Sequence, residues 1–203
     1  MTIVAINPAT NEKIQKYDEL SPAEVTEILT QADFAYRSWR NTSFEQRATL
    51  MHKAAQILRE RAAEYGRLMS VEMGKPIKDG RAEAEKCAWV CDYYAENARR
   101  FLEPEVVDTD ASKSFVTFQP LGVVLAVMPW NFPFWQVFRF AAPNLMAGNV
   151  GVLKHASNVP GCALAIERIF REAGFPENVF RSLIVGSDQV NAIIENPVVR
   201  AVT

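Results

Sequence analysis

The sequence predicts an α/β protein in which a helical layer precedes part of a doubly wound parallel sheet. The first half carries apolar residues at three- and four-residue spacing, which is typical of helices that cover a core. The second half alternates short apolar runs with helical segments, as parallel strands joined by helices do. We therefore expect a mainly helical part over residues 1–102, edge strands over 103–120 and βαβ units over 121–203.

The predicted helices of the first half follow a hairpin. Turn residues between two short apolar segments indicate this hairpin, which comprises Ile3–Ile6, Asn7–Asn11 and Lys13–Tyr17. A capping sequence then begins the first helix, with Ser21 as the cap, Pro22 at the first helical position and Glu24 three residues after the cap. The three predicted helices run from Ser21 to about Trp39, from Ser43 to Gly74 and from about Ile77 to Leu102.

The elements of the second half begin after a break at Glu103–Glu105. Alternating apolar and polar residues over Ser114–Gln119 predict an exposed or edge strand. Buried parallel strands are predicted at Gly122–Met128, Val150–Leu153, Val179–Val185 and Val198–Val202. The helices between them are predicted at Phe134–Ala147, Val159–Ala173 and Asp188–Glu195. The last predicted strand starts at Val198, and Ala201–Thr203 look like part of it, where a βα domain is expected to continue.

The composition excludes several function classes. Of the 203 residues, 49% are hydrophobic and 23% are charged, so the chain can bury a core. A net charge of −2 argues against nucleic-acid and membrane-surface partners. The apolar run Val123–Met128 is far too short to span a membrane, and no secretory signal precedes it. Three cysteines do not make a disulfide framework, so we expect a cytoplasmic protein.

Ligands of open α/β sheets bind beyond the carboxyl ends of the strands. Two such ends are conspicuous here, Pro129–Pro133 after the first buried strand and Lys154–Ser157 after the second. The glycine-rich motifs of common nucleotide sites are absent from the sequence. The chemistry is therefore expected at these two ends.

Asn131 stands between two prolines that stiffen the first strand end. An amide donor fixed there can stabilise an oxyanion as a carbonyl is attacked, although a turn in which Asn131 bonds its own backbone is an alternative. Trp135 and Arg139 lie one helical turn farther along, on one face. The Arg139 guanidinium suits a carboxylate, and a surface ion pair or a packing role is its alternative.

Lys154 and Ser157 offer a cation and a small hydroxyl at the second strand end. Together they suit ribose hydroxyls or a phosphate, while a solvated loop lysine is the alternative. Cys87 and Cys91 have no partner at metal-ligand spacing, so we expect packing rather than a metal site. Cys162 is near a helix start, where a thiol pKa can fall, but packing is again the expected role.

At these strand ends the sequence resembles the aldehyde dehydrogenase superfamily. The resemblance covers essentially the whole chain and rests on highly specific motifs. They are Asn7-Pro8-Ala9-Thr10, Glu72-Met73-Gly74-Lys75-Pro76, Gln119-Pro120-Leu121-Gly122-Val123, Met128-Pro129-Trp130-Asn131-Phe132-Pro133, Ala147-Gly148-Asn149, Leu153-Lys154 and Glu172-Ala173-Gly174-Phe175-Pro176. The segments Trp135–Arg139 and Leu153–Pro160 look most like the succinate-semialdehyde dehydrogenase branch, especially its cyanobacterial type.

The resemblance implies a role for each matching residue. Asn131 corresponds to the oxyanion-hole amide, and Trp135 and Arg139 to the pocket that holds the distal carboxylate of succinic semialdehyde. The implied cofactor-binding residues are Met128, Pro129, Trp130, Asn131, Lys154, Ala156 and Ser157. Many NAD-preferring relatives carry Glu where this chain has Ser157, so NADP is the expected cofactor, with NAD possible.

The resemblance also implies where the family's remaining catalytic residues are found. The family's nucleophilic cysteine and general-base glutamate come after the position of Thr203, so residues 1–203 alone are expected to be inactive. The full protein is expected to be a homodimer or homotetramer, and Ser114–Gln119 falls in the family's oligomerisation region. Alternatives are a dehydrogenase for another small aldehyde and a non-catalytic module that binds nucleotide or associates with a partner.

Overall fold

The fold, taken from a computed structural model that describes residues 2–203, is a four-stranded parallel sheet beside a layer of helices. The first half contains β1 (Thr2–Ile6), β2 (Lys13–Asp18), α1 (Pro22–Trp39), α2 (Phe44–Glu60), α3 (Ala62–Met73) and α4 (Ile77–Phe101). The second half contains β3 (Glu105–Val106), β4 (Phe115–Val116), β5 (Val123–Met128), α5 (Trp135–Met146), β6 (Val150–His155), α6 (Pro160–Glu172), β7 (Phe180–Ser182), the 3₁₀ turn η1 (Ser187–Gln189), α7 (Val190–Ile194) and β8 (Val199–Val202).

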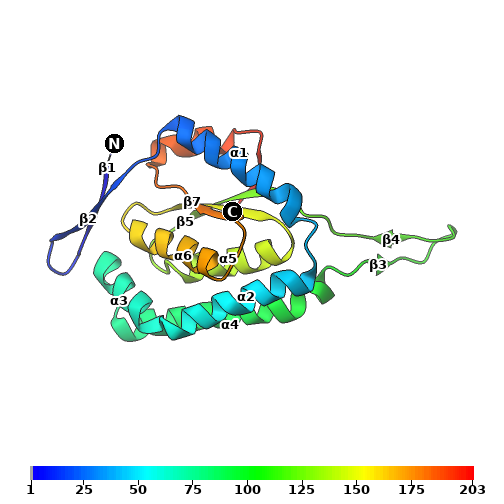
Figure 1. The fold of residues 1–203 in the computed structure, drawn as a ribbon, viewed down its shortest axis with the longest axis horizontal. Helices are drawn as coiled ribbons and strands as arrows, with labels where there is room; N and C mark the ends of the chain where they lie inside the picture. The colour runs from blue at the N-terminus through cyan, green and yellow to red at the C-terminus, as the bar shows by residue number, and fades with distance from the viewer. Residues whose placement is uncertain (1) are drawn as a thin grey trace.

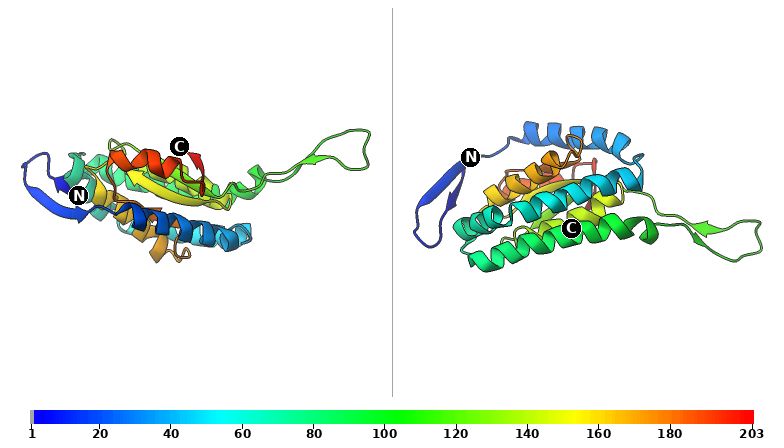
Figure 2. Two further views of the ribbon diagram at one scale, coloured as in Figure 1. Left: turned by 90° about the horizontal axis from the view of Figure 1, so that it is seen from above. Right: turned by 60° about the horizontal axis from the view of Figure 1, so that its bottom comes forward.

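The main sheet has the strand order β7-β6-β5-β8, and its strands are parallel. Helices α5 and α6 lie between this sheet and the helices α2 and α4, whereas α1 lies at the opposite side of the molecule from α4 (Figures 1 and 2). The predicted α/β class with a parallel sheet is therefore confirmed. No helix within residues 2–203 is long and apolar enough to cross a membrane.

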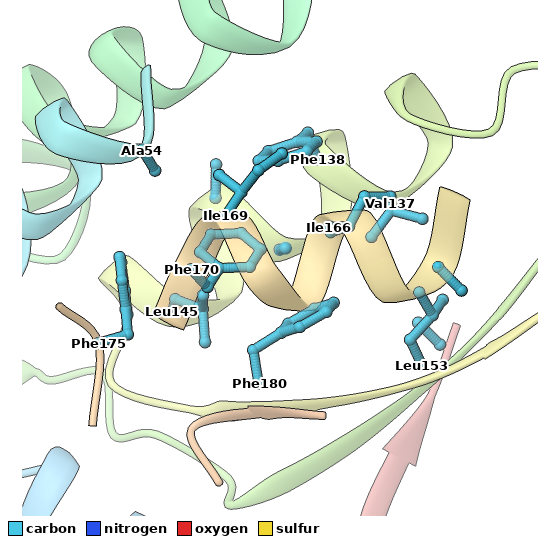
Figure 3. Close-up of a cluster of buried hydrophobic side chains, with 14 of the residues drawn as sticks. Ala54, Val137, Phe138, Leu145, Leu153, Ile166, Ile169, Phe170, Phe175 and Phe180 are labelled. Carbon is cyan, nitrogen blue, oxygen red and sulfur yellow. The ribbon is translucent and has the colours of Figure 1, made fainter. Parts of the chain in front are cut away.

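The core fills the space between the sheet and α5 and α6 (Figure 3). Its centre is aromatic: the ring of Phe170 lies 4.7 Å from that of Phe180 and 5.3 Å from that of Phe138, measured between centroids. These rings come from α6, β7 and α5, and all three are almost completely buried. Aromatic packing thus joins α5 to α6, and α6 to β7, across the layers.

Two short antiparallel hairpins stand outside the main sheet. β1 pairs with β2 as expected from the turn at residues 7–11. β3 pairs with β4, and together they form an arm that projects from the body (Figure 1). The strand predicted over Ser114–Gln119 is shorter in the structure: β4 holds only Phe115 and Val116, which lie opposite Val106 and Glu105.

Several predicted boundaries need correction. The helix expected from Ser43 to Gly74 is broken at Arg61, whose φ of −110° and ψ of 20° redirect the chain, and Arg61 pairs there with Glu172 of α6 at 2.8 Å. β6 extends to His155 instead of ending at Leu153, because it stays paired with β5 as far as Met128. β7 spans Phe180–Ser182 only, and a 3₁₀ turn replaces the first turn of the helix predicted from Asp188.

Candidate active site

The carboxyl ends of β5 and β6 lie side by side. Met128 is directly opposite His155 in the register, and the Ala156 amide donates to the Met128 carbonyl at 3.0 Å. The two predicted ligand-binding segments therefore emerge from neighbouring strands at the same edge of the sheet. This arrangement follows from the parallel pairing, which sets successive strands pointing the same way.

The segment Trp130–Phe132 after β5 is exposed, with half of the Trp130 surface accessible. Asn131 is exposed as well, and its side-chain amide forms no hydrogen bond with any of residues 2–203. The alternative in which Asn131 bonds its own backbone is therefore not what the structure contains. The amide is available to a ligand.

The flanks of this segment are anchored. Oε1 of Glu83, a buried residue of α4, accepts hydrogen bonds from the Phe134 and Trp135 amides at 2.9 Å each. These amides are at the start of α5, where backbone donors have no partner inside the helix. A lone exposed loop would sample many conformations, but this one begins at a buried strand and ends at a capped helix.

His155 anchors the same segment from β6. Its Nε2 lies 2.8 Å from the Pro133 carbonyl, and its Nδ1 accepts from the Ala156 amide at 2.8 Å. The two bonds require the neutral tautomer with hydrogen on Nε2. Burial lowers the pKa of His155, which favours that neutral form.

Lys75 completes the anchor. Its ammonium group pairs with the Glu83 carboxylate and lies 4.0 Å from the centre of the Phe132 ring. Both charged residues are buried. In the same region Gly80 lets α4 approach α3 closely, because a Cβ there would stand 2.9 Å from the Cα of Gly66.

Trp135 and Arg139 both belong to α5 but have different surroundings. Lys86 of α4 places its ammonium 3.9 Å from the centre of the half-buried Trp135 indole. Arg139 is exposed, forms no ion pair within residues 2–203, and lines a hollow of about 360 Å³ together with Met128. A surface ion pair is thus not its role, and its guanidinium is available to an anion.

The end of β6 faces a second hollow, of about 430 Å³, which Lys154 and Ser157 line. Lys154 is 8% exposed and lies on the strand, so the solvated-loop alternative is wrong. Among residues 2–203 no carboxylate forms an ion pair with it, and burial lowers its pKa. Ala156 lies beside Ser157 in an adjoining crevice, whereas Met128 belongs to the Arg139 hollow.

Two carboxylates that sequence reasoning missed line the Lys154 hollow. They are Glu19, which accepts from the Gly186 amide at 3.2 Å, and Asp188 of η1. Lys154 and Ser157 fit the ribose hydroxyls and a phosphate of a dinucleotide, and the two acids oppose additional negative charge. No local pattern marks Glu19, which is far from Lys154 in sequence.

The three thiols are unsuited to attack a substrate. Cys87, Cys91 and Cys162 are buried, and burial is the main cause that raises the pKa of each. At the start of α6, the carboxylate of Glu72 accepts from the Cys162 amide at 2.8 Å and also raises the thiol pKa. Packing is therefore the role of Cys162, and residues 2–203 hold no thiol poised as a nucleophile.

Comparison with known proteins agrees with this geometry. The model of the aldehyde dehydrogenase family matches residues 1–203. A probable NADP⁺-dependent succinate-semialdehyde dehydrogenase of Synechocystis is 53% identical over 203 residues, which are the whole of this chain and 45% of that protein. An NADP⁺-dependent succinate-semialdehyde dehydrogenase of Mycobacterium leprae is 47% identical over 206 residues, with the same coverage. The chain thus spans less than half the length of these relatives.

Solved structures give the same result. The succinic semialdehyde dehydrogenase of Streptococcus pyogenes, solved in complex with NADP⁺, superposes with a TM-score of 0.94 at 35% identity. The match covers 98% of this chain and 44% of that one. A succinate-semialdehyde dehydrogenase from Burkholderia pseudomallei superposes with a TM-score of 0.94 at 27% identity. By its motifs, its fold and these matches, the chain belongs to the aldehyde dehydrogenase family.

Proposed function

We propose that these residues work in an NADP-preferring dehydrogenase that oxidises succinic semialdehyde to succinate. The observation that carries the proposal is the unpaired Asn131 amide at the end of β5, with the free Arg139 guanidinium on the helix that follows. The similarity to the NADP⁺-dependent succinate-semialdehyde dehydrogenases of Synechocystis and Mycobacterium leprae supports the same substrate and cofactor.

The roles proposed for this chain's residues follow from their chemistry. Asn131 donates to the oxygen of the aldehyde as that oxygen gains negative charge during nucleophilic attack. Arg139 binds the distal carboxylate of the substrate, and Trp135 lines the same pocket. When bound, NADP⁺ accepts the hydride that leaves the aldehyde carbon. Because the three thiols of residues 2–203 are buried, we expect the attacking thiolate and the general base to come from another segment.

Cofactor preference rests on Lys154 and Ser157. A glutamate at position 157 would repel the 2′-phosphate of NADP, whereas a serine leaves room for it beside the Lys154 cation. Glu19 and Asp188 act against this preference, so we expect NADP to be favoured without NAD being excluded.

The test is to measure kcat/KM of the full-length protein for succinic semialdehyde and for butanal, each with NADP and with NAD. We expect the highest value for succinic semialdehyde with NADP. Equal values for the two aldehydes would contradict the substrate, and a clear preference for NAD would contradict the cofactor. Purified residues 1–203 serve as the control and are expected to show no turnover.

The projecting hairpin is proposed as an association element of a homodimer or homotetramer. It exposes apolar side chains, with Val106 85% accessible and Phe115 48% accessible. Exposed apolar strands of this kind pair with another chain. Sedimentation of a full-length variant with Val106 and Phe115 replaced by Lys should show dissociation, and unchanged mass would contradict the proposal.

The free, buried thiols suit a reducing compartment, so we place this enzyme in the cytoplasm.

A further inference from the structure

We infer that Glu83, held by Lys75, is a positioning residue that fixes the Asn131 segment for transition-state binding. The inference rests on the proposed function, since it concerns how the oxyanion donor is held. Both residues come from the helical layer, α4 and the turn before it, whereas Asn131 follows a strand of the sheet. The helical layer would then contribute to catalysis without touching the substrate.

Glu83 forms the first part of the anchor that holds the Asn131 segment. Its Oε1 accepts both the Phe134 and the Trp135 amide, which are three and four residues after Asn131. A carboxylate at a helix N-terminus is stabilised by the partial positive charge of the free amides. These two bonds restrain the start of α5 and, with it, the path of the chain from Asn131 into the helix.

Lys75 is the second part. It neutralises the other oxygen of the Glu83 carboxylate, and its ammonium lies against the ring of Phe132, the residue directly after Asn131. The backbone of Lys75 is itself held, because the Ser70 hydroxyl donates to its carbonyl at 2.6 Å. One buried ion pair therefore contacts the segment at Phe132, directly after the functional amide, and again at the first amides of α5.

Capping a helix does not by itself require such a pair. At the start of α6, Glu72 accepts the Gly161 and Cys162 amides at 2.8 Å each, and no Lys or Arg of residues 2–203 pairs with it. A buried ion pair adds little to stability compared with neutral residues of the same shape. What the Lys75–Glu83 pair adds beyond a cap is the contact with Phe132, next to Asn131.

Positioning of this precision matters because an oxyanion donor acts only in its productive geometry. A misplacement of about 1 Å can lower a rate by roughly 100-fold. We therefore expect Lys75→Met and Glu83→Gln in the full-length protein to lower kcat for succinic semialdehyde by about 10- to 100-fold. The KM of the aldehyde and the Kd of NADP should change less than about threefold, since Arg139 and Lys154 are untouched.

The matched control is Glu85→Gln, the same chemical change two residues along α4 at an exposed position. Its kcat should equal that of the wild type. The double variant Lys75→Met/Glu83→Gln keeps an oxygen that can accept both amides and leaves no buried charge unpaired. If the two residues act as one unit, the double variant loses less kcat than the product of the two single losses.

A readout independent of activity accompanies the kinetics. Hydrogen exchange of the Phe134 and Trp135 amides should accelerate at least about tenfold in Glu83→Gln or Lys75→Met, while the Gly161 and Cys162 amides capped by Glu72 exchange as in the wild type. Unchanged exchange would overturn the anchoring. Faster exchange with an unchanged kcat, or a Kd for NADP that worsens as much as kcat falls, would overturn the positioning role. Failure of the proposed function is separate, because it would appear as a wild type that does not oxidise succinic semialdehyde.

Discussion

The carboxyl ends of β5 and β6 are anchored in the same way but carry different functional groups. Each strand leads to a helix whose first amides bond to a buried glutamate of the helical layer, Glu83 for α5 and Glu72 for α6. The β5 end holds a neutral amide in a tightly anchored segment, whereas the β6 end holds a buried cation beside an open hollow. Anchoring suits a group that must be placed precisely, and an unpaired charge beside open space suits a group that binds a charged ligand.

The largest expected effect tests the β5 end itself. Asn131→Ala should lower kcat for succinic semialdehyde by about 100- to 1,000-fold, because the developing oxyanion loses a fixed donor. Steady-state kinetics of the full-length variant measure this. A loss below about fivefold would mean that Asn131 does not hold the oxyanion.

A smaller loss is expected at Arg139, which binds substrate without acting on the reacting carbon. Arg139→Ala should lower kcat/KM for succinic semialdehyde by about 10- to 100-fold, since a hydrogen bond to a charged group contributes about 1.5–3 kcal/mol. For butanal the change should be about twofold or less. Equal losses for both aldehydes would make Arg139 structural.

The β6 end is tested by Ser157→Glu. The added carboxylate should repel the 2′-phosphate and bond the ribose hydroxyls of NAD, so the ratio of kcat/KM for NADP over NAD should fall about tenfold or more. Ser157→Ala is the control without charge, and it should change the ratio far less. An unchanged ratio in Ser157→Glu would place the 2′-phosphate elsewhere.

Removing the charge of Asp188 should change the cofactor preference in the opposite direction to Ser157→Glu, and by a smaller factor. Removing its charge from the Lys154 hollow by Asp188→Asn is expected to raise the preference for NADP by about threefold, because the group is exposed and partly screened. Asp110→Asn, on the projecting hairpin, removes the same charge far from the hollow in the fold. If both variants change the ratio equally, the effect is one of net charge and not of the hollow.

The smallest effect concerns the pH dependence of stability that the Glu72 cap contributes. Burial raises the pKa of Glu72 above its ordinary value of 4.5 despite the two amides that bond it. The folded protein therefore binds this proton more tightly than the unfolded chain, and stability falls as pH rises from 4.5 through the raised pKa. In Glu72→Gln the decline of Tm over this pH range should be smaller than in the wild type, because this proton no longer contributes. Parallel Tm profiles of the two proteins would exclude the raised pKa.

The sequence contains local signals for much of this comparison. Continuous apolar runs predicted β5 and β6, and the two prolines around Asn131 marked the stiff segment between strand and helix. Lys154 was expected to follow its strand, because a charged residue ends an apolar run. In the fold it still lies in β6, near the carboxyl end of the strand, and its head group borders the hollow that it lines with Ser157.

The anchors could not be predicted in the same way. Glu83 bonds to amides 51 and 52 residues away in sequence, and no spacing rule links positions so distant. Glu19 reaches Gly186 across 167 residues. His155 bonds to Pro133, which follows the neighbouring strand and is 22 residues away in sequence. These residues are set by how the layers pack, which the pattern of each segment does not contain.

The central claim is that the β5 end serves the aldehyde and the β6 end serves the cofactor. The most direct test measures kcat at saturating NADP, and the Kd of NADP, for full-length Asn131→Ala, Ser157→Glu and the double variant. We expect Asn131→Ala to lose kcat with its Kd unchanged, Ser157→Glu to lose affinity with its kcat retained, and the double variant to show the sum of both free-energy changes. If each single variant lowered kcat and affinity together, the two ends would not be separate sites and the account would be wrong.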